Sequence, residues 1–142
     1  MAKPFEMSLT DNIPEAKKLL RNAGERNIKE ATFFVHKTLV ENVLTGNRSG
    51  RKYRIPSGKK GAEKKTYYTA SAPGEAPARR TGALATDYKP RVKGFIGTVG
   101  AMLLYALMLE KGTKKMAPRP HLGSAFSMSH DDIIRILSRN YL

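Results

Sequence analysis

The apolar pattern between residues 13 and 44 constrains the fold of this chain more than any other feature. Apolar side chains recur mostly three or four positions apart, as on one face of a helix, at positions 16, 19, 20, 23, 31, 34, 35, 39 and 43. Asp11 and Asn12 offer capping side chains before this stretch, Pro14 suits a first helical turn, and Gly46 is a typical stop. The pattern predicts one long amphipathic helix over about 13–44. A stripe of this length needs a surface to cover it, most simply a sheet built by the rest of the chain.

The second half of the chain carries strand and helix signals in turn. β-Branched and aromatic residues bounded by glycines predict neighbouring antiparallel strands near 83–92 and 94–100. The apolar run 101–110 predicts a short helix that is buried on most sides. A last helix is predicted over 121–139, unless Ser129 and the acids after it cap a fresh helix. The predicted class is α+β: a long N-terminal helix and a C-terminal helix packed on a small antiparallel sheet, with a long basic loop or hairpin.

The length of 142 residues predicts one domain spanning 1–142. Within it, residues 46–66 consist mainly of Gly, Ser, Lys and Arg, and weak alternation over 51–55 and 65–70 would suit a basic hairpin. With so few bulky side chains, this segment cannot offset its ordering entropy by its own burial, so we expect it to order against a partner. Together with a Pro-containing connector it predicts a basic, flexible arm over 46–80.

The positive charge of the chain is concentrated in its middle. Residues 48–119 hold 17 Lys and Arg against 4 Asp and Glu, a net charge of +13, whereas the whole chain carries +14 and the rest therefore sums to +1. A concentrated positive field favours a polyanionic partner, either a nucleic acid or an acidic protein surface. The basic residues of the arm interleave with tyrosines, which could stack on bases. These candidate contact residues are Arg48, Arg51, Lys52, Tyr53, Arg54, Lys59, Lys60, Lys64, Lys65, Tyr67 and Tyr68.

The sequence offers no pattern typical of a catalytic, cofactor or metal site. It contains no Cys, its three His are far apart, and no metal-binding or phosphate-loop spacing occurs. Ser129, His130 and Asp131 are the residue types of a hydrolase catalytic triad. Adjacent residues on one helix point in different directions, however, so helix capping is the preferred interpretation of these residues. The longest apolar stretch, 101–109, is too short to span a bilayer. We therefore expect no enzyme activity, no cofactor and no membrane partner, and synthesis in a cytoplasm.

Three blocks in the second half carry a resemblance. Residues 81–84 read Thr-Gly-Ala-Leu, residues 105–113 read Tyr-Ala-Leu-Met-Leu-Glu-Lys-Gly-Thr, and residues 119–122 read Arg-Pro-His-Leu. In this order they resemble the small tail-completion, or head–tail joining, proteins of long-tailed bacteriophages, over roughly residues 15–137. The chain departs from that pattern at Lys111, where an aromatic residue is common, and at 85–87 after the first block.

The resemblance implies a structural protein of the virion neck. It implies a ring, with six subunits as the expected number, between the head connector or stopper and the tail terminator or tail tube proteins. Genomic DNA passing through the channel would be contacted without sequence reading. Further candidate interface residues are Glu110, Gly112, Thr113 and Arg119: Glu110 could pair with Arg119 or with a base of a neighbouring subunit, and the family pattern favours a role in fixing the turn. The alternative hypothesis is a free-standing basic nucleic-acid-binding protein, whose affinity would fall steeply with salt.

Overall fold

A computed structural model describes residues 13–55 and 66–139 of the chain. The N-terminal part forms α1 (Ile13–Lys37), which continues without a break into one turn of π-helix, η1 (Thr38–Val43). The Leu44 N–H donates to the Leu39 carbonyl at 2.9 Å, the wider bond expected of a π-turn. The long helix predicted over 13–44 is therefore confirmed.

The remaining elements are two hairpins and three helices. β1 (Lys52–Ile55) pairs antiparallel with β2 (Thr66–Thr69), and β3 (Lys89–Lys93) pairs antiparallel with β4 (Ile96–Gly100). The helices are α2 (Ala83–Asp87), α3 (Leu104–Lys111) and α4 (Leu122–Leu137). The class is α+β, as the sequence predicts.

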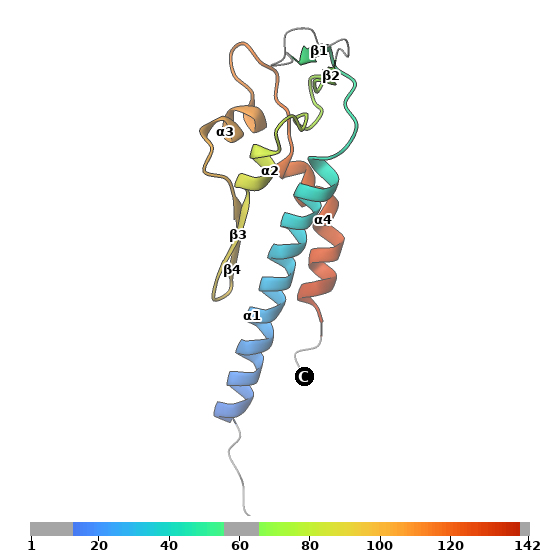
Figure 1. The fold of residues 1–142 in the computed structure, drawn as a ribbon. Helices are drawn as coiled ribbons and strands as arrows, with labels where there is room; N and C mark the ends of the chain where they lie inside the picture. The colour runs from blue at the N-terminus through green and yellow to red at the C-terminus, as the bar shows by residue number, and fades with distance from the viewer. Residues whose placement is uncertain (1–12, 56–65, 140–142) are drawn as a thin grey trace, which may run out of the picture.

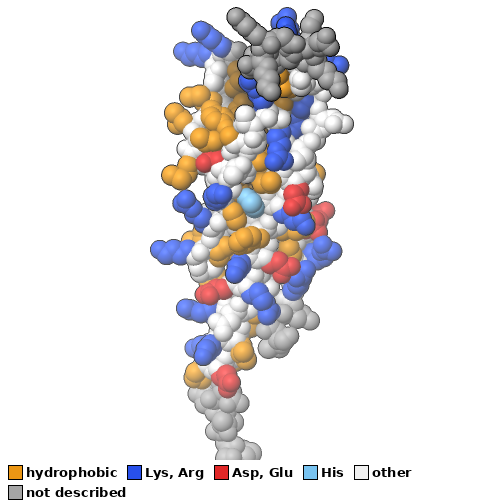
Figure 2. All heavy atoms as spheres, viewed as in Figure 1, with side chains coloured by type: hydrophobic (Ala, Val, Ile, Leu, Met, Phe, Trp, Pro, Cys, Tyr) orange, Lys and Arg blue, Asp and Glu red, His pale blue; other side chains and the backbone are white. Residues whose placement is uncertain are grey.

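The elements are arranged along α1. Figure 1 shows α4 running antiparallel to α1 on one side and the β3–β4 hairpin on the other, while α2, α3 and the β1–β2 hairpin gather near the end of η1. The first turns of α1 project beyond the other described elements, and residues 13–22 are all exposed (Figures 1 and 2). The predicted sheet under the long helix is therefore a two-stranded hairpin, and α4 supplies much of the remaining cover.

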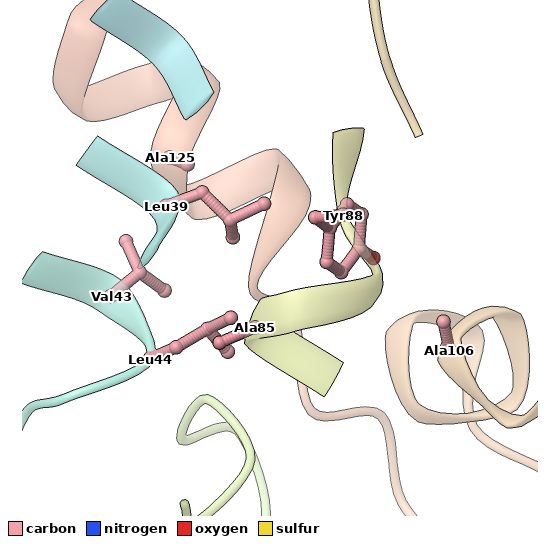
Figure 3. Close-up of a cluster of buried hydrophobic side chains, with 7 residues drawn as sticks. All are labelled: Leu39, Val43, Leu44, Ala85, Tyr88, Ala106 and Ala125. Atoms are coloured by element: carbon pink, nitrogen blue, oxygen red, sulfur yellow. The ribbon is translucent and has the colours of Figure 1, made fainter. Parts of the chain in front are cut away.

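The core is small and lies where η1, α2, α3 and α4 meet. Leu39 and Ala125 are fully buried, and the cluster around them is shown in Figure 3. It consists of Leu39, Val43, Leu44, Ala85, Tyr88, Ala106 and Ala125. Three of its seven members are alanines, so the core depends on close approach of backbones more than on large side chains.

Three sequence predictions are wrong in part. Residues 83–87, predicted as strand, form the short helix α2, because Leu84 and Ala85 turn toward the core instead of alternating. The helix at α3 is predicted to be buried, yet only Ala106 in it is buried. The single C-terminal helix predicted over 121–139 is confirmed as α4, whereas the capping role predicted for Ser129 is wrong, because Ser129 is fully buried within the undivided helix and caps nothing.

Candidate assembly surface and nucleic-acid interface

Glu110 at the end of α3 holds the start of α4. Its carboxylate accepts the backbone N–H groups of His121 at 2.9 Å, Leu122 at 3.0 Å and Gly123 at 2.9 Å. The first N–H groups of a helix have no partner within the helix, so one carboxylate supplies what an N-cap side chain normally would. Glu110 thus links the end of α3 to the start of α4 across the intervening turn.

The surroundings of Glu110 favour its ionised form. Burial works to raise the pKa of this carboxyl, but the three backbone N–H bonds and the adjacent His121 ring outweigh it and hold the pKa below its ordinary value. The positive end of the α4 dipole lies at the same place and acts in the same direction. Glu110 is thus a charged group directed into the fold.

A chain of polar contacts continues from Glu110 to α1. His121 is fully buried; its Nδ1 lies 2.9 Å from the Glu110 carboxylate and its Nε2 lies 2.8 Å from the Tyr88 hydroxyl. The Tyr88 carbonyl in turn lies 2.9 Å from Nε2 of His36. Burial, followed by the nearby charges of Glu110 and Asp87, raises the pKa of Tyr88 to about 12. This chain of contacts joins α1, α2, α3 and α4 through the buried ring of His121.

The turn after α3 is fixed by its backbone. Gly112 has φ of 76°, and a side chain there would meet the Met116 carbonyl and the ring of Pro118, so glycine is required. Thr113 and Met116 exchange two backbone hydrogen bonds, of 2.8 and 3.2 Å. Arg119 bonds Ser71 through its side chain and the Leu109 carbonyl through its N–H at 2.7 Å. Arg119 therefore bonds Ser71, in the Pro-containing segment between β2 and α2. The suggested ion pair between Glu110 and Arg119 does not form.

Two charged side chains attach the base of the arm to the rest of the subunit. The Arg48 guanidinium donates to the carbonyls of Val43 at 2.6 Å and Pro77 at 3.1 Å. The Glu75 carboxylate accepts the Ser49 hydroxyl and the N–H groups of Ser49 at 3.1 Å and Ala72 at 2.9 Å. These bonds, first the one from the Ser49 side chain, lower the pKa of Glu75 to about 2. These bonds connect the base of the arm to the rest of the subunit. That the arm orders against a partner stays a prediction, and residues 56–65 lie outside the described part.

The β1–β2 hairpin has an inner face on which rings and cations stack on one another. Tyr53 and Tyr68 are direct cross-strand partners with ring centroids 5.6 Å apart. The Arg51 guanidinium lies 5.9 Å from the Tyr53 ring, and that of Arg80 lies 5.3 Å from the Tyr68 ring. Arg51, Tyr53 and Tyr68 thus contact neighbours within the subunit, while Arg51 and Tyr53 also stay exposed, Tyr53 to 44 per cent.

The outer face of the same hairpin carries Lys52, Arg54 and Tyr67, which alternate with the inner-face residues. All three are exposed, Tyr67 to 54 per cent, and they contact no charged or aromatic group in the part of the chain that the structure describes. The arm candidates therefore divide into engaged and available groups. The four remaining ones, Lys59, Lys60, Lys64 and Lys65, lie outside the described residues.

An apolar surface covers the outward side of α3. Met102 is 82 per cent exposed, Leu104 75 per cent and Leu107 57 per cent, with Tyr105 and Met108 exposed beside them. We call these five residues the α3 surface; Figure 2 shows hydrophobic side chains gathered at the flank where α3 lies in Figure 1. Clusters of large exposed apolar side chains are common where proteins contact other molecules.

Asp87 positions this surface, and sequence reasoning missed it. Its carboxylate accepts the N–H groups of Met102 at 2.6 Å and Leu103 at 2.7 Å and so fixes the start of α3. The cap lies 15 residues away in the chain, so no local capping pattern could have indicated it. Glu75 was missed for a similar reason, since its partner Ser49 is 26 residues away.

In residues 13–55 and 66–139, no group of three or more His, Cys, Asp or Glu is placed to hold a metal ion. Within the same ranges, no helix is long and apolar enough to cross a membrane. In comparisons with protein-family models, curated proteins and solved structures, the chain matches none.

Proposed function

We propose that this chain is a structural protein of a tailed-bacteriophage virion: a tail-completion or head–tail joining component that forms a ring at the neck. The resemblance of the three sequence blocks gives the proposal its family. The α3 surface is the observation that carries it physically, because a subunit with a small core leaves five large apolar side chains of one segment in water. A subunit built for assembly is expected to expose such a surface until a neighbour covers it.

The proposed mechanism is assembly without chemistry. A closed ring requires a head-to-tail interface in which two different patches of each subunit meet. The α3 surface would supply one patch, and the exposed apolar residues near the start of α1, Ile13, Leu19 and Leu20, would supply apolar contact at the other end of the subunit. Burial of these side chains would stabilise the ring by about 25 cal/mol for each Å² of apolar surface removed from water. The partners on either side would be the head connector or stopper and the tail terminator or tail tube.

The test is a double variant of the α3 surface, Leu104→Asp with Leu107→Asp, examined in complementation of a phage lacking this gene. Both side chains are exposed, so thermal unfolding of the free subunit should be nearly unchanged. Heads and tails should fail to join, as counted by electron microscopy. Met128→Asp on α4, also exposed, is the control and should assemble normally. Normal joining by the double variant, or absence of the chain from purified virions by mass spectrometry, would refute the proposal.

The rival function is a free-standing nucleic-acid-binding protein, favoured by the available cations of the outer hairpin face. It predicts tight, salt-sensitive binding by a monomer and no effect of the α3 double variant on any phenotype. Native mass spectrometry of purified virion necks separates the two, because only the assembly role predicts a ring there.

A further inference from the structure

Strand β3 carries three cations that the sequence analysis did not single out. Lys89, Arg91 and Lys93 occupy alternate positions of the strand and are all exposed. Alternate side chains of a strand share one face and lie about 7 Å apart, so the three form a row about 14 Å long. We call it the β3 cation row; Figure 2 shows Lys and Arg side chains projecting along the flank where the β3–β4 hairpin lies in Figure 1.

The packing of the hairpin on α1 fixes the direction of this row. Pro90 and Val92 line a hollow together with Phe33 of α1. Gly97, which pairs with Val92, lies so close to Thr32 that a side chain there would collide with the threonine hydroxyl. Since Pro90 and Val92 face α1, the residues that alternate with them face solvent.

In residues 13–55 and 66–139, no carboxylate forms an ion pair with the β3 cation row. The sequence holds no Asp or Glu between Asp87 and Glu110. Asp87 accepts the two backbone N–H groups just before α3, and Glu110 accepts those at the start of α4. Glu25 lines the hollow on the α1 side, behind Pro90 and Val92. Within the described part of the chain, none of the three cations makes an ion pair.

The face around the row is open and polar. Lys89 pairs across the hairpin with Gly100, Arg91 with Thr98, and Lys93 with Ile96. Glycine and threonine leave the cations accessible, and Ile96 at one end is the sole large apolar side chain among these cross-strand neighbours. Protein interfaces usually have an apolar or aromatic centre, whereas contact with phosphates needs accessible cations and little else. The composition of this face therefore favours a nucleic acid over an acidic protein.

We propose that the β3 cation row binds the phosphodiester backbone of a nucleic acid without reading its sequence. Each cation that contacts a phosphate releases condensed counterions, so binding weakens as salt rises. The row offers no aromatic ring to stack on a base and no amide side chain to pair with adenine, so its expected contacts are those of cations with phosphates. This binding is a property of the single subunit and goes beyond the assembly role, so the two can fail separately.

The test compares two triple variants of the full chain that lose the same charge. Lys89→Gln, Arg91→Gln and Lys93→Gln remove the row; Lys17→Gln, Lys18→Gln and Arg21→Gln remove three cations from the exposed start of α1. Binding to a fluorescent 30-base-pair duplex, and to oligo(dT) of equal length, is measured across a KCl series. For the duplex, the slope of log K against log salt should fall by roughly 2.7 in the row variant, about 0.9 for each lost contact. The control variant should change the slope by less than about 1.

The remaining outcomes are equally clear. A loss on the duplex assigns the row to double-stranded DNA, and a loss confined to oligo(dT) assigns it to single strands; either supports the proposal. Equal losses in both triple variants would mean that binding follows net charge alone. A slope that is unchanged for both the duplex and oligo(dT) in the row variant would mean that other residues, such as those of the arm, carry the binding. A row variant that loses poly-L-glutamate but keeps both oligonucleotides would assign the row to an acidic protein. Each of these three results overturns the proposal. Thermal unfolding checks that both variants stay folded.

Discussion

At the scale of single residues, the Glu110 side chain at the end of α3 holds three backbone N–H groups at the start of α4. Alanine at this position would leave three N–H groups at the start of α4 without a partner. We expect Glu110→Ala to lower the free energy of unfolding by roughly 1–3 kcal/mol, measured by urea denaturation. Glu41→Ala is the control, because its ion pair with Lys37 spans 3.9 Å between exposed side chains and should contribute less than about 0.5 kcal/mol. Equal effects of the two substitutions would contradict the capping role.

Glu75 gives a pH-dependent prediction at the same scale. Its pKa is about 2 in the folded chain against an ordinary value of 4.5, so the unfolded chain binds the proton more readily. The stability that Glu75 contributes is therefore complete above about pH 4.5 and is lost as the pH falls toward 2. We expect the amide NMR signals of Ser49 and Ala72, which donate to this carboxylate, to titrate together with a midpoint well below 4.5. In Glu75→Gln this transition should vanish, and a midpoint near 4.5 in the unchanged chain would refute the tether.

At the scale of elements, the contact between β4 and α1 depends on one glycine. A methyl group at Gly97 would collide with the Thr32 hydroxyl, which itself donates to the Ile28 carbonyl at 2.7 Å. We expect Gly97→Ala to lower the free energy of unfolding by roughly 1–3 kcal/mol, because the hairpin must move away from the helix. Adding Thr32→Ala should recover part of this loss, and a double-mutant cycle measures the coupling. Additive effects would mean that the two residues do not press on each other.

The elements also show what can be predicted from the sequence and what cannot. Periodicity and caps predict α1 with η1, both hairpins and α4, because the signals for these elements lie within a few residues of each other. The prediction from sequence fails at α3, because an apolar composition is compatible with both a buried helix and an exposed one. The contacts at the base of the arm could not be predicted either, because Arg48 and Glu75 bond groups that lie 26 or more residues away in the chain. Charge counts indicate a polyanion, but only the pairing of β3 with β4 and its packing on α1 direct Lys89, Arg91 and Lys93 to one solvent face.

At the scale of the whole molecule, the uneven distribution of the core predicts uneven stability. Residues 13–22 of α1 are all exposed, whereas Val35, Leu39 and Val43 are buried among the other helices. Local opening is easier where few apolar contacts must be broken. In the free chain we expect hydrogen exchange of amides in residues 17–22 to be on the order of 100-fold faster than in 35–43. The amides of Gly50 and Ala70, which bond across the base of the arm at 3.0 and 2.9 Å, should be protected without any partner.

The same measurement on intact particles tests whether the exposed ends of the subunit are interfaces. If neighbours cover the start of α1 and the α3 surface, residues 17–22 and 104–111 should both gain protection in particles, while 35–43 should change little because they are already buried. Uniform protection along α1 in the dilute free chain would mean that a second copy already covers it, which a concentration series would reveal. Protection of neither end in particles would contradict a head-to-tail ring, since an interface that buries these side chains must also slow the exchange of the helices that carry them.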